Sequence, residues 1–337
     1  MERTALGTDY AEINMLAALQ FMPGERPYID RSGSEPDTRE LLLHLGCNVL
    51  RTAHLARTVI GVLNAMGFEF NAAGGPAHCC GIVHHRNDDP RRARAVVANT
   101  MRHFADYGAT RVLMLCPSCK EYFDDVVTKD QPVAFSYEPV TAFIARNLVR
   151  ARFTRRIPRR VALHRHAGHP QSRSDLEDAS TILRAIPGLE LVDLEVEASS
   201  GRHCAGKWIA EAGVDQWRQT IRHFLEAARA ARVDAVATIY HSCHREICPE
   251  EAHFPFAIVN YLTLLGEAMG IEHPDAYKSW KLRADADAIF NDVRPYVEAN
   301  GLDPARVRKV LVRAFASGSP SPSKKKGDVP ANQRIAQ

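Results

Sequence analysis

Cysteines are concentrated in one part of this 337-residue sequence. Thiolates are typical ligands of zinc and of iron–sulfur clusters. A single zinc ion takes four ligands, and two consecutive cysteines fit poorly around one tetrahedral ion. Buried structural cysteines explain isolated positions better than they explain a consecutive pair beside a Cys-x-x-Cys motif. We therefore favour a cluster of several iron atoms, because five of the eight cysteines form the pattern Cys47-x31-Cys79-Cys80-Gly81-x34-Cys116-Pro117-Ser118-Cys119.

The elements that must position these cysteines alternate between strand and helix. Residues 41–46 and 111–115 read as short buried strands, and each ends next to a cysteine of the pattern. Helical periodicity follows the first strand up to Gly67, and a long amphipathic helix is predicted over 90–107. Parallel strands end at a common sheet edge, where open α/β folds place their ligands. We expect all five thiols at that edge.

The same order of elements returns in the second half of the chain. Strands are predicted at 161–164, 189–194 and 234–240, with helices over 175–185 and 214–231 between them. Strands alternating with helices of this length predict parallel sheets in an α/β fold. The order indicates an internal duplication, with two domains packed around a pseudo-twofold axis.

The cysteine pattern resembles that of a known family. It is similar to the cysteine-rich CCG domain found in heterodisulfide reductase and its relatives. These include the sulfur-oxidising heterodisulfide-reductase-like complexes and the iron–sulfur subunits of lactate, glycolate and glycerol-3-phosphate oxidation. The resemblance covers about residues 40–265. It implies a noncubane 4Fe–4S cluster held by Cys47, Cys79, Cys80, Cys116 and Cys119.

The second half departs from the family pattern. Its sequence matches LHLGC (43–47) with LHRHA (163–167), CCG (79–81) with His-Cys-Ala (203–205), and CPSC (116–119) with Tyr-His-Ser-Cys (240–243). Three of five cysteines are therefore missing from the second copy. Imidazole and thiolate together suit zinc or iron. We predict a second, smaller metal site formed by His166, His203, Cys204 and Cys243. A decayed site that lines a pocket stays open as the alternative.

Sequence patterns and composition predict the domain boundaries and the cellular compartment. The predicted parts are an N-terminal extension (1–38), a complete CCG domain (39–155), a degenerate CCG domain (156–271), C-terminal helices (272–315) and a disordered tail (316–337). A net charge of +3 gives no reason to expect nucleic acid. The sequence shows no secretory signal and no apolar run of about 18 residues, so we expect a cytoplasmic protein without membrane insertion.

The resemblance implies an oxidoreductase component of sulfur metabolism. It would transfer electrons to or from a disulfide, thiol or persulfide substrate, and an open noncubane cluster can bind substrate sulfur and split a disulfide in one-electron steps. The chain carries no nucleotide-binding GxGxxG motif, so a ferredoxin-like protein of the same complex and a flavoprotein are the expected partners. No catalytic side chain is assigned. The alternatives are a pure electron-transfer subunit of a 2-hydroxyacid or glycerol-3-phosphate dehydrogenase, and a zinc-holding assembly or sensor protein.

Overall fold

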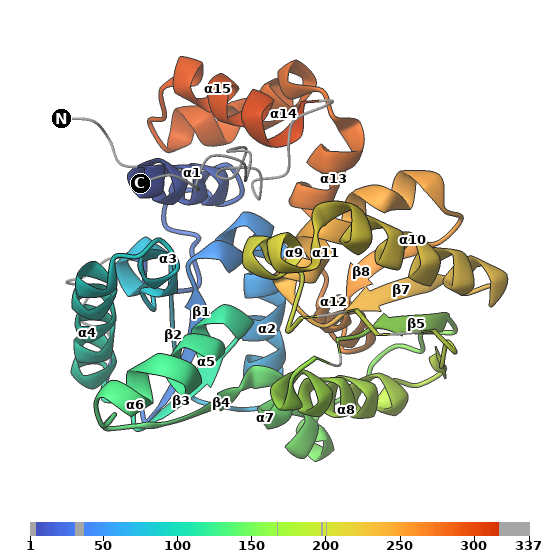
Figure 1. Ribbon diagram of the computed structural model, residues 1–337, viewed down its shortest axis with the longest axis horizontal. Coiled ribbons are helices and arrows are strands. Elements are labelled where there is room, and N and C mark those ends of the chain that lie inside the picture. The colour runs from blue at the N-terminus through green and yellow to red at the C-terminus, as the bar shows by residue number, and fades with distance from the viewer. Residues whose placement is uncertain (1–4, 31–36, 167, 197, 200, 317–337) are drawn as a thin grey trace, which may run out of the picture.

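The first sheet carries the complete cysteine pattern. The structure is a computed structural model that describes residues 5–30, 37–166, 168–196, 198–199 and 201–316. Four parallel strands lie in the order β2-β1-β3-β4 (Figure 1). Their bounds are β1 Leu41–Gly46, β2 Asn71–Gly74, β3 Arg111–Met114 and β4 Ser136–Pro139. The helices of this domain are α2 Ala53–Ala65, α3 Ile82–His85, α4 Pro90–Asp106, α5 Pro117–Tyr122, α6 Thr128–Asp130 and α7 Val140–Arg146.

The second sheet repeats the arrangement of the first. Its four parallel strands have the order β6-β5-β7-β8, which is the same path through the sheet. The strands are β5 Arg160–His164, β6 Glu190–Val192, β7 Ala235–Thr238 and β8 Ala257–Asn260. The helices are α8 Pro170–Ala185, α9 Gly206–Ala212, α10 Val214–Ala230, α11 His241–Ile247 and α12 Tyr261–Ala268. The predicted fold of two duplicated α/β domains is confirmed.

Local sequence signals account for the helix that follows the Cys-Cys-Gly turn. Asp89 accepts a hydrogen bond from the Arg92 backbone N–H and caps α4, and Pro90 occupies the first helical position, where a missing N–H costs nothing. Gly108 follows the helix with a φ of 74°, a conformation that glycine adopts without strain. The helix therefore starts and stops where the sequence predicts, which fixes the distance between the cysteines on either side of it.

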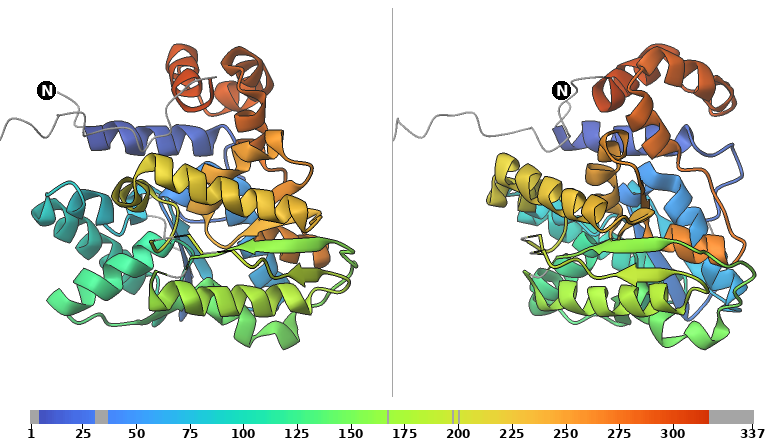
Figure 2. Two further views of the ribbon diagram at one scale, coloured as in Figure 1. Left: turned by 45° about the vertical axis from the view of Figure 1, so that its right-hand side comes forward. Right: turned by 90° about the vertical axis from the view of Figure 1, so that its right-hand side faces the viewer.

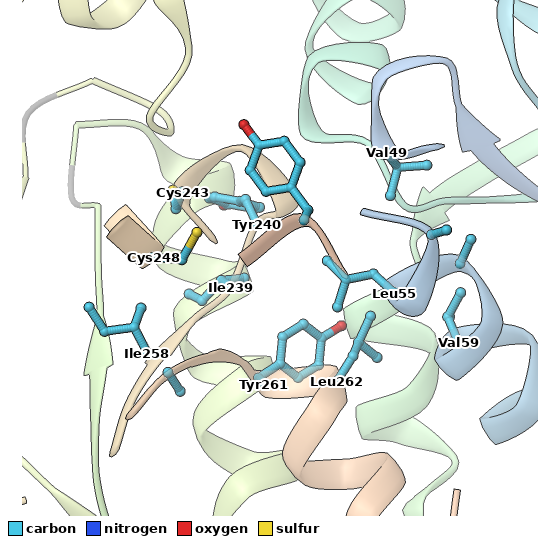
Figure 3. Close-up of a cluster of buried hydrophobic side chains, with 14 of the residues drawn as sticks. Val49, Leu55, Val59, Ile239, Tyr240, Cys243, Cys248, Ile258, Tyr261 and Leu262 are labelled. Atoms are coloured by element: carbon cyan, nitrogen blue, oxygen red, sulfur yellow. The ribbon is translucent and has the colours of Figure 1, made fainter. Parts of the chain in front are cut away.

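The two domains share a continuous apolar core. Leu55 and Val59 of α2 lie beside Tyr261 and Leu262 of α12 in Figure 3. The Tyr261 hydroxyl is within 2.8 Å of Thr141 Oγ1 in the first domain, so even the polar end of this side chain is satisfied across the interface. Burial of several large apolar side chains at this junction holds the two sheets in a fixed relation.

A helical layer covers one end of both domains. It consists of α1 Ala5–Ala18 together with α13 Ala276–Arg283, α14 Ala286–Ala299 and α15 Pro304–Phe315 (Figures 1 and 2). Asn300, at the end of α14, donates to the carbonyl oxygens of Ala18 and Phe21, both at 3.0 Å. Glu12 of α1 also pairs with Arg313 of α15. The N-terminal extension and the C-terminal helices thus form one layer.

The sequence-based elements differ from the structure in a few places. The sequence predicts no clear element within residues 1–38, but 5–18 form α1. The sequence predicts strands near 68–71 and at 132–137, and the structure places them a few residues later, as β2 and β4. The sequence predicts neither β8 nor α12. Residues 317–337, most of the predicted disordered tail, lie outside the described residues. Within the described part of the chain, no helix has both the length and the apolarity needed to cross a bilayer.

Candidate metal centres

The first candidate centre lies at the carboxyl edge of the first sheet. The side chains come from the end of β1, the turn before α3 and the start of α5. This is the sheet edge at which parallel α/β folds bind ligands. All five cysteines named by the pattern are buried and none forms a disulfide: Cys47, Cys79, Cys80, Cys116 and Cys119.

These five thiols contact one another in a chain. The order of contacts is Cys47–Cys79–Cys80–Cys119–Cys116. Two groups of described side chains have three or more potential ligand atoms that all lie within 4.8 Å of one another. None of these five cysteines belongs to either group. One tetrahedral ion needs ligands that converge on a point. An extended row of thiols fits a polynuclear cluster better.

Cys79 is held by more polar contacts than its neighbours. Its Sγ lies 3.2 Å from the Tyr10 hydroxyl and accepts a hydrogen bond of 3.4 Å from the Gly81 N–H. Thr100 of α4 donates to the Cys79 carbonyl at 2.7 Å, which fixes the turn. Hydrogen bonds from Cys47 and Cys80 hold the pKa of Cys79 well below its usual range despite burial. A lowered pKa favours the thiolate, the form that binds metal.

Gly46 packs tightly against two of the thiol side chains. Its φ is 78°, and a Cβ at this position would lie 2.8 Å from Cys116 Cβ and 3.3 Å from Cys119 Sγ. Any other residue would therefore intrude on two of the five cysteines. Glycine at position 46 therefore lets the backbone that follows β1 pass close to Cys116 and Cys119.

The second candidate centre lies at the matching edge of the second sheet. His166 Nε2 is 3.3 Å from Cys243 Sγ and 3.5 Å from Cys204 Sγ, and His164 Nε2 is 3.6 Å from Cys204 Sγ. The Cys204 backbone N–H also donates to Cys243 Sγ. One ligand atom from each of four buried side chains lies within 4.8 Å of the others: His164, His166, Cys204 and Cys243. Two imidazoles and two thiolates match a tetrahedral zinc set.

The predicted ligand set changes in one member. His203 lies outside the group and His164 takes its place. The His203 ring contacts Ser242 Oγ at 3.2 Å and, across the domain interface, Ser118 Oγ at 3.1 Å and Glu121 at 3.6 Å. Spacing alone does not tell which way a turn residue points. The alternation of side chains along an extended chain could have identified His164 as a ligand, because residues 164 and 166 lie on the same face.

Strand register explains why the two centres differ. His44 pairs with Met114 in the first sheet as His164 pairs with Thr238 in the second. Position 166 therefore corresponds to Gly46, and an imidazole stands where the first domain has no side chain. Ala167, which matches Cys47 in sequence, lies outside the described residues. The second domain therefore gains an imidazole at this position, and its two imidazoles with two thiols suit a single ion.

Electrostatics favour a thiolate in the second centre. Burial by itself would raise the pKa of Cys243. Hydrogen bonds and charge interactions from Cys204, His166 and His164 outweigh burial, and they hold the pKa of Cys243 well below its usual range. Burial also lowers the pKa of His164, which keeps this imidazole neutral and able to donate its lone pair. Both changes favour the metal-binding forms of the side chains.

A narrow cavity lies between the two domains, next to α5 and α8. Its volume is about 30 Å³, room for one or two water molecules. Lys120 and Glu121 line it from the first domain, with Arg202 and Asp175 opposite. Asp175 accepts hydrogen bonds of 2.7 Å from the Tyr240 hydroxyl and from Gln171, but burial outweighs them and raises its pKa to about 6.

This raised pKa predicts a pH-dependent effect of Asp175→Asn. Because the folded state holds a proton that the unfolded chain releases, wild-type stability falls as pH rises from the ordinary aspartate pKa through about 6. Asparagine does not ionise, so we expect the variant to gain about 2 kcal/mol relative to wild type between pH 4 and pH 7. Urea unfolding across this range measures it, with exposed Asp215→Asn as the control. If the free energies of unfolding of wild type and Asp175→Asn differ by the same amount at every pH, the prediction is contradicted.

The fold and the two centres define a duplicated α/β protein with buried thiol and imidazole groups at equivalent sheet edges. The family model described as the cysteine-rich domain (CCG) matches the chain twice, at residues 41–124 and 166–247. The chain therefore contains two CCG domains. Domains of this kind, together with the two side-chain groups, fit a role in metal binding and electron transfer.

Other comparisons give weaker similarity. No curated protein matches the sequence of this chain. The crystal structure of a hypothetical protein from Helicobacter pylori has a TM-score of 0.47 at 10% identity, covering 83% of this chain and 57% of that one. An aspartate racemase homologue from Pyrococcus horikoshii OT3 has a TM-score of 0.31 at 10% identity, covering 68% of this chain and 97% of that one. Neither similarity defines a function.

Proposed function

We propose that this chain is the iron–sulfur subunit of a heterodisulfide-reductase-like complex. It transfers electrons to or from a disulfide, thiol or persulfide substrate. The observation that carries the proposal is the row of five buried, mutually contacting thiols at the carboxyl edge of the first sheet. A noncubane 4Fe–4S cluster is the group proposed for these cysteines, and such a cluster supplies single-electron transfer when bound.

The surrounding side chains suit that group. The five cysteines supply the thiolates, and burial excludes water from them. Cys116 and Cys119 lie at the start of α5, where the positive end of the helix dipole stabilises negative charge. The Tyr10 hydroxyl is placed to donate a hydrogen bond to the Cys79 sulfur. Hydrogen bonds to the sulfur ligands are one means by which proteins tune cluster potentials.

The proposed complex includes other proteins that exchange electrons with this chain. The sequence has no dinucleotide-binding GxGxxG motif, so the proposal needs other proteins to deliver electrons. The proposed partners are a ferredoxin-like protein of the same complex and a flavoprotein. The proposed substrate is a small or carrier-bound sulfur compound. A pure electron-transfer subunit of a 2-hydroxyacid or glycerol-3-phosphate dehydrogenase, and a zinc-holding assembly or sensor protein, remain the alternatives.

Anaerobic purification separates these functions. We expect about four iron and four sulfide per chain, together with reduction of low-molecular-weight disulfides by viologen-reduced protein. Iron and sulfide without disulfide turnover would favour the pure electron-transfer subunit. Zinc without sulfide would overturn the proposal in favour of the assembly or sensor protein. Pull-down from the source cells tests the partners separately, with ferredoxin-type and flavin-containing proteins as the expected companions.

We further propose that the second domain holds a single zinc or iron ion. The proposed ligands are His164, His166, Cys204 and Cys243, whose close contacts support the assignment. A mononuclear ion would fasten β5 to the turn before α9 and to the start of α11. The ion then has a structural role beside the redox centre of the first domain.

The variants Cys204→Ala and His203→Ala give opposite expectations. Replacement of a residue that only hydrogen-bonds to a metal ligand typically lowers metal affinity about 10–100-fold. Loss of a thiolate ligand itself should lower the affinity by at least that much. His203 contacts Ser118 and Ser242 instead of the group, so His203→Ala should keep the metal. Elemental analysis after dialysis against a weak chelator measures both. Equal metal loss in the two variants, or retention in both, would contradict the ligand set.

A further inference from the structure

A third group of potential ligands lies where the two domains meet the helical layer. His54 belongs to α2, His244 belongs to α11, and Asp275 is the N-cap of α13. His54 Nδ1 is 3.3 Å from one Asp275 carboxylate oxygen, and His244 Nε2 is 2.6 Å from the other. One ligand atom from each residue lies within 4.8 Å of the others. Three distant parts of the chain thus converge on one carboxylate.

Hydrogen bonding in this group is incomplete. His54 is 2% exposed and His244 is fully buried. Among the described residues, neither nitrogen of His54 has a hydrogen-bond partner, and Nδ1 of His244 has none. Buried polar atoms of folded proteins are normally satisfied, and His54 Nδ1, which lies 3.3 Å from the Asp275 carboxylate without forming a hydrogen bond, is the nitrogen that a bound ion would satisfy. Burial keeps the His54 imidazole neutral, since it lowers its pKa to about 3, and neutral imidazole is the form that binds metals.

A cavity adjoins the group on the side of His54. Its volume is about 200 Å³, and its lining includes His54 and the two residues that flank Asp275, Pro274 and Ala276. His273 lines the same cavity without belonging to the ligand group. Water or a small ligand in this cavity would lie next to His54, on one side of the proposed ion. Closed structural zinc sites lack such an opening.

We propose that His54, His244 and Asp275 bind one divalent transition-metal ion. Two imidazoles and one carboxylate, with positions left open, are a donor set typical of zinc or iron(II). The donors are nitrogen and oxygen alone, which separates this site from the thiol-containing centres. His244 follows Cys243 in sequence, but adjacent residues of a helix point about 100° apart and serve different sites. The ion would join both domains to the helical layer, and the proposal does not rest on the redox function.

Cobalt(II) binding to the full-length protein tests the site. In chelator-treated Cys204→Ala protein the thiol-containing mononuclear site keeps only three of its four donors, so a titration with one equivalent of Co²⁺ favours the site of nitrogen and oxygen donors. We expect it to bind one equivalent of Co²⁺ with weak visible bands and without thiolate-to-cobalt charge transfer. The same equivalent should disappear in Cys204→Ala combined with His54→Ala or with Asp275→Ser, where serine still caps α13 but supplies no carboxylate. His273→Ala in that background is the matched control and should bind Co²⁺ as before.

Each outcome of the Co²⁺ experiment either supports or overturns the proposed site. Failure of folded Cys204→Ala protein to bind Co²⁺ would overturn the proposal. So would unchanged binding when His54 or Asp275 is replaced, because the ion would then lie elsewhere. If a combined variant fails to fold, the Cys204→Ala protein still decides. A spectrum of nitrogen and oxygen donors for the first equivalent of Co²⁺ supports the site, and thiolate charge transfer for that first equivalent contradicts it. Iron and sulfide content in the first domain should stay unchanged in all folded variants.

Discussion

Cys80→Ser is expected to remove the iron and acid-labile sulfide from the first domain. Cys80 is central in the row of thiols, in contact with both Cys79 and Cys119. A serine oxygen is a harder and far less available ligand than a thiolate. No neighbouring thiol is spare, because the other four cysteines already have places in the set. We expect iron content to fall at least tenfold and the EPR signal of the cluster to vanish or change form.

Cys248→Ser is the matched control for this prediction. Cys248 is equally buried, but its Sγ contacts only the Arg245 carbonyl among the hydrogen bonds described, at 4.0 Å. It belongs to neither candidate centre. Iron and sulfide should therefore stay at the wild-type level in this variant. Equal iron content in both variants, with an unchanged EPR spectrum, would refute the five-cysteine centre.

Gly81→Ala is expected to destabilise the protein by roughly 2–5 kcal/mol, the sum of backbone strain and overpacking. Gly81 has a φ of 93°, which a residue with a Cβ adopts only at a cost. A Cβ there would lie 2.5 Å from the Ala93 carbonyl oxygen, and backbone of α4 cannot move as a flexible side chain can. The glycine of the Cys-Cys-Gly motif is thus required by close approach of the turn to α4.

Gly67→Ala separates the two contributions. Gly67 has a φ of 75°, but a Cβ there would meet nothing within 4 Å. This variant should show the backbone cost alone, on the order of 1–2 kcal/mol. Urea denaturation of both variants, with iron content measured in parallel, gives the difference. Equal destabilisation of the two would mean that the contact with Ala93 relaxes easily, contrary to this prediction.

The sequence by itself determined the duplicated α/β fold and named the five cysteines of the first candidate centre. Alternation of short apolar strands with amphipathic helices predicts parallel sheets, and parallel strands end at a common edge. Cysteines that directly follow such strands must therefore gather there, as Cys47 and Cys116 do. Thiol chemistry depends on residue type alone. Type and position together were enough to infer a thiolate-rich metal centre.

Only the tertiary structure decided which other side chains join these centres. His164 replaces His203 in the second group because the turn directs His203 across the domain interface, toward Ser118. Tyr10 reaches Cys79 from a helix 69 positions away in the chain. His54 and Asp275 meet only because the helical layer packs on both domains. Local periodicity fixes the face of a regular element, whereas turn direction and domain packing depend on contacts between distant segments.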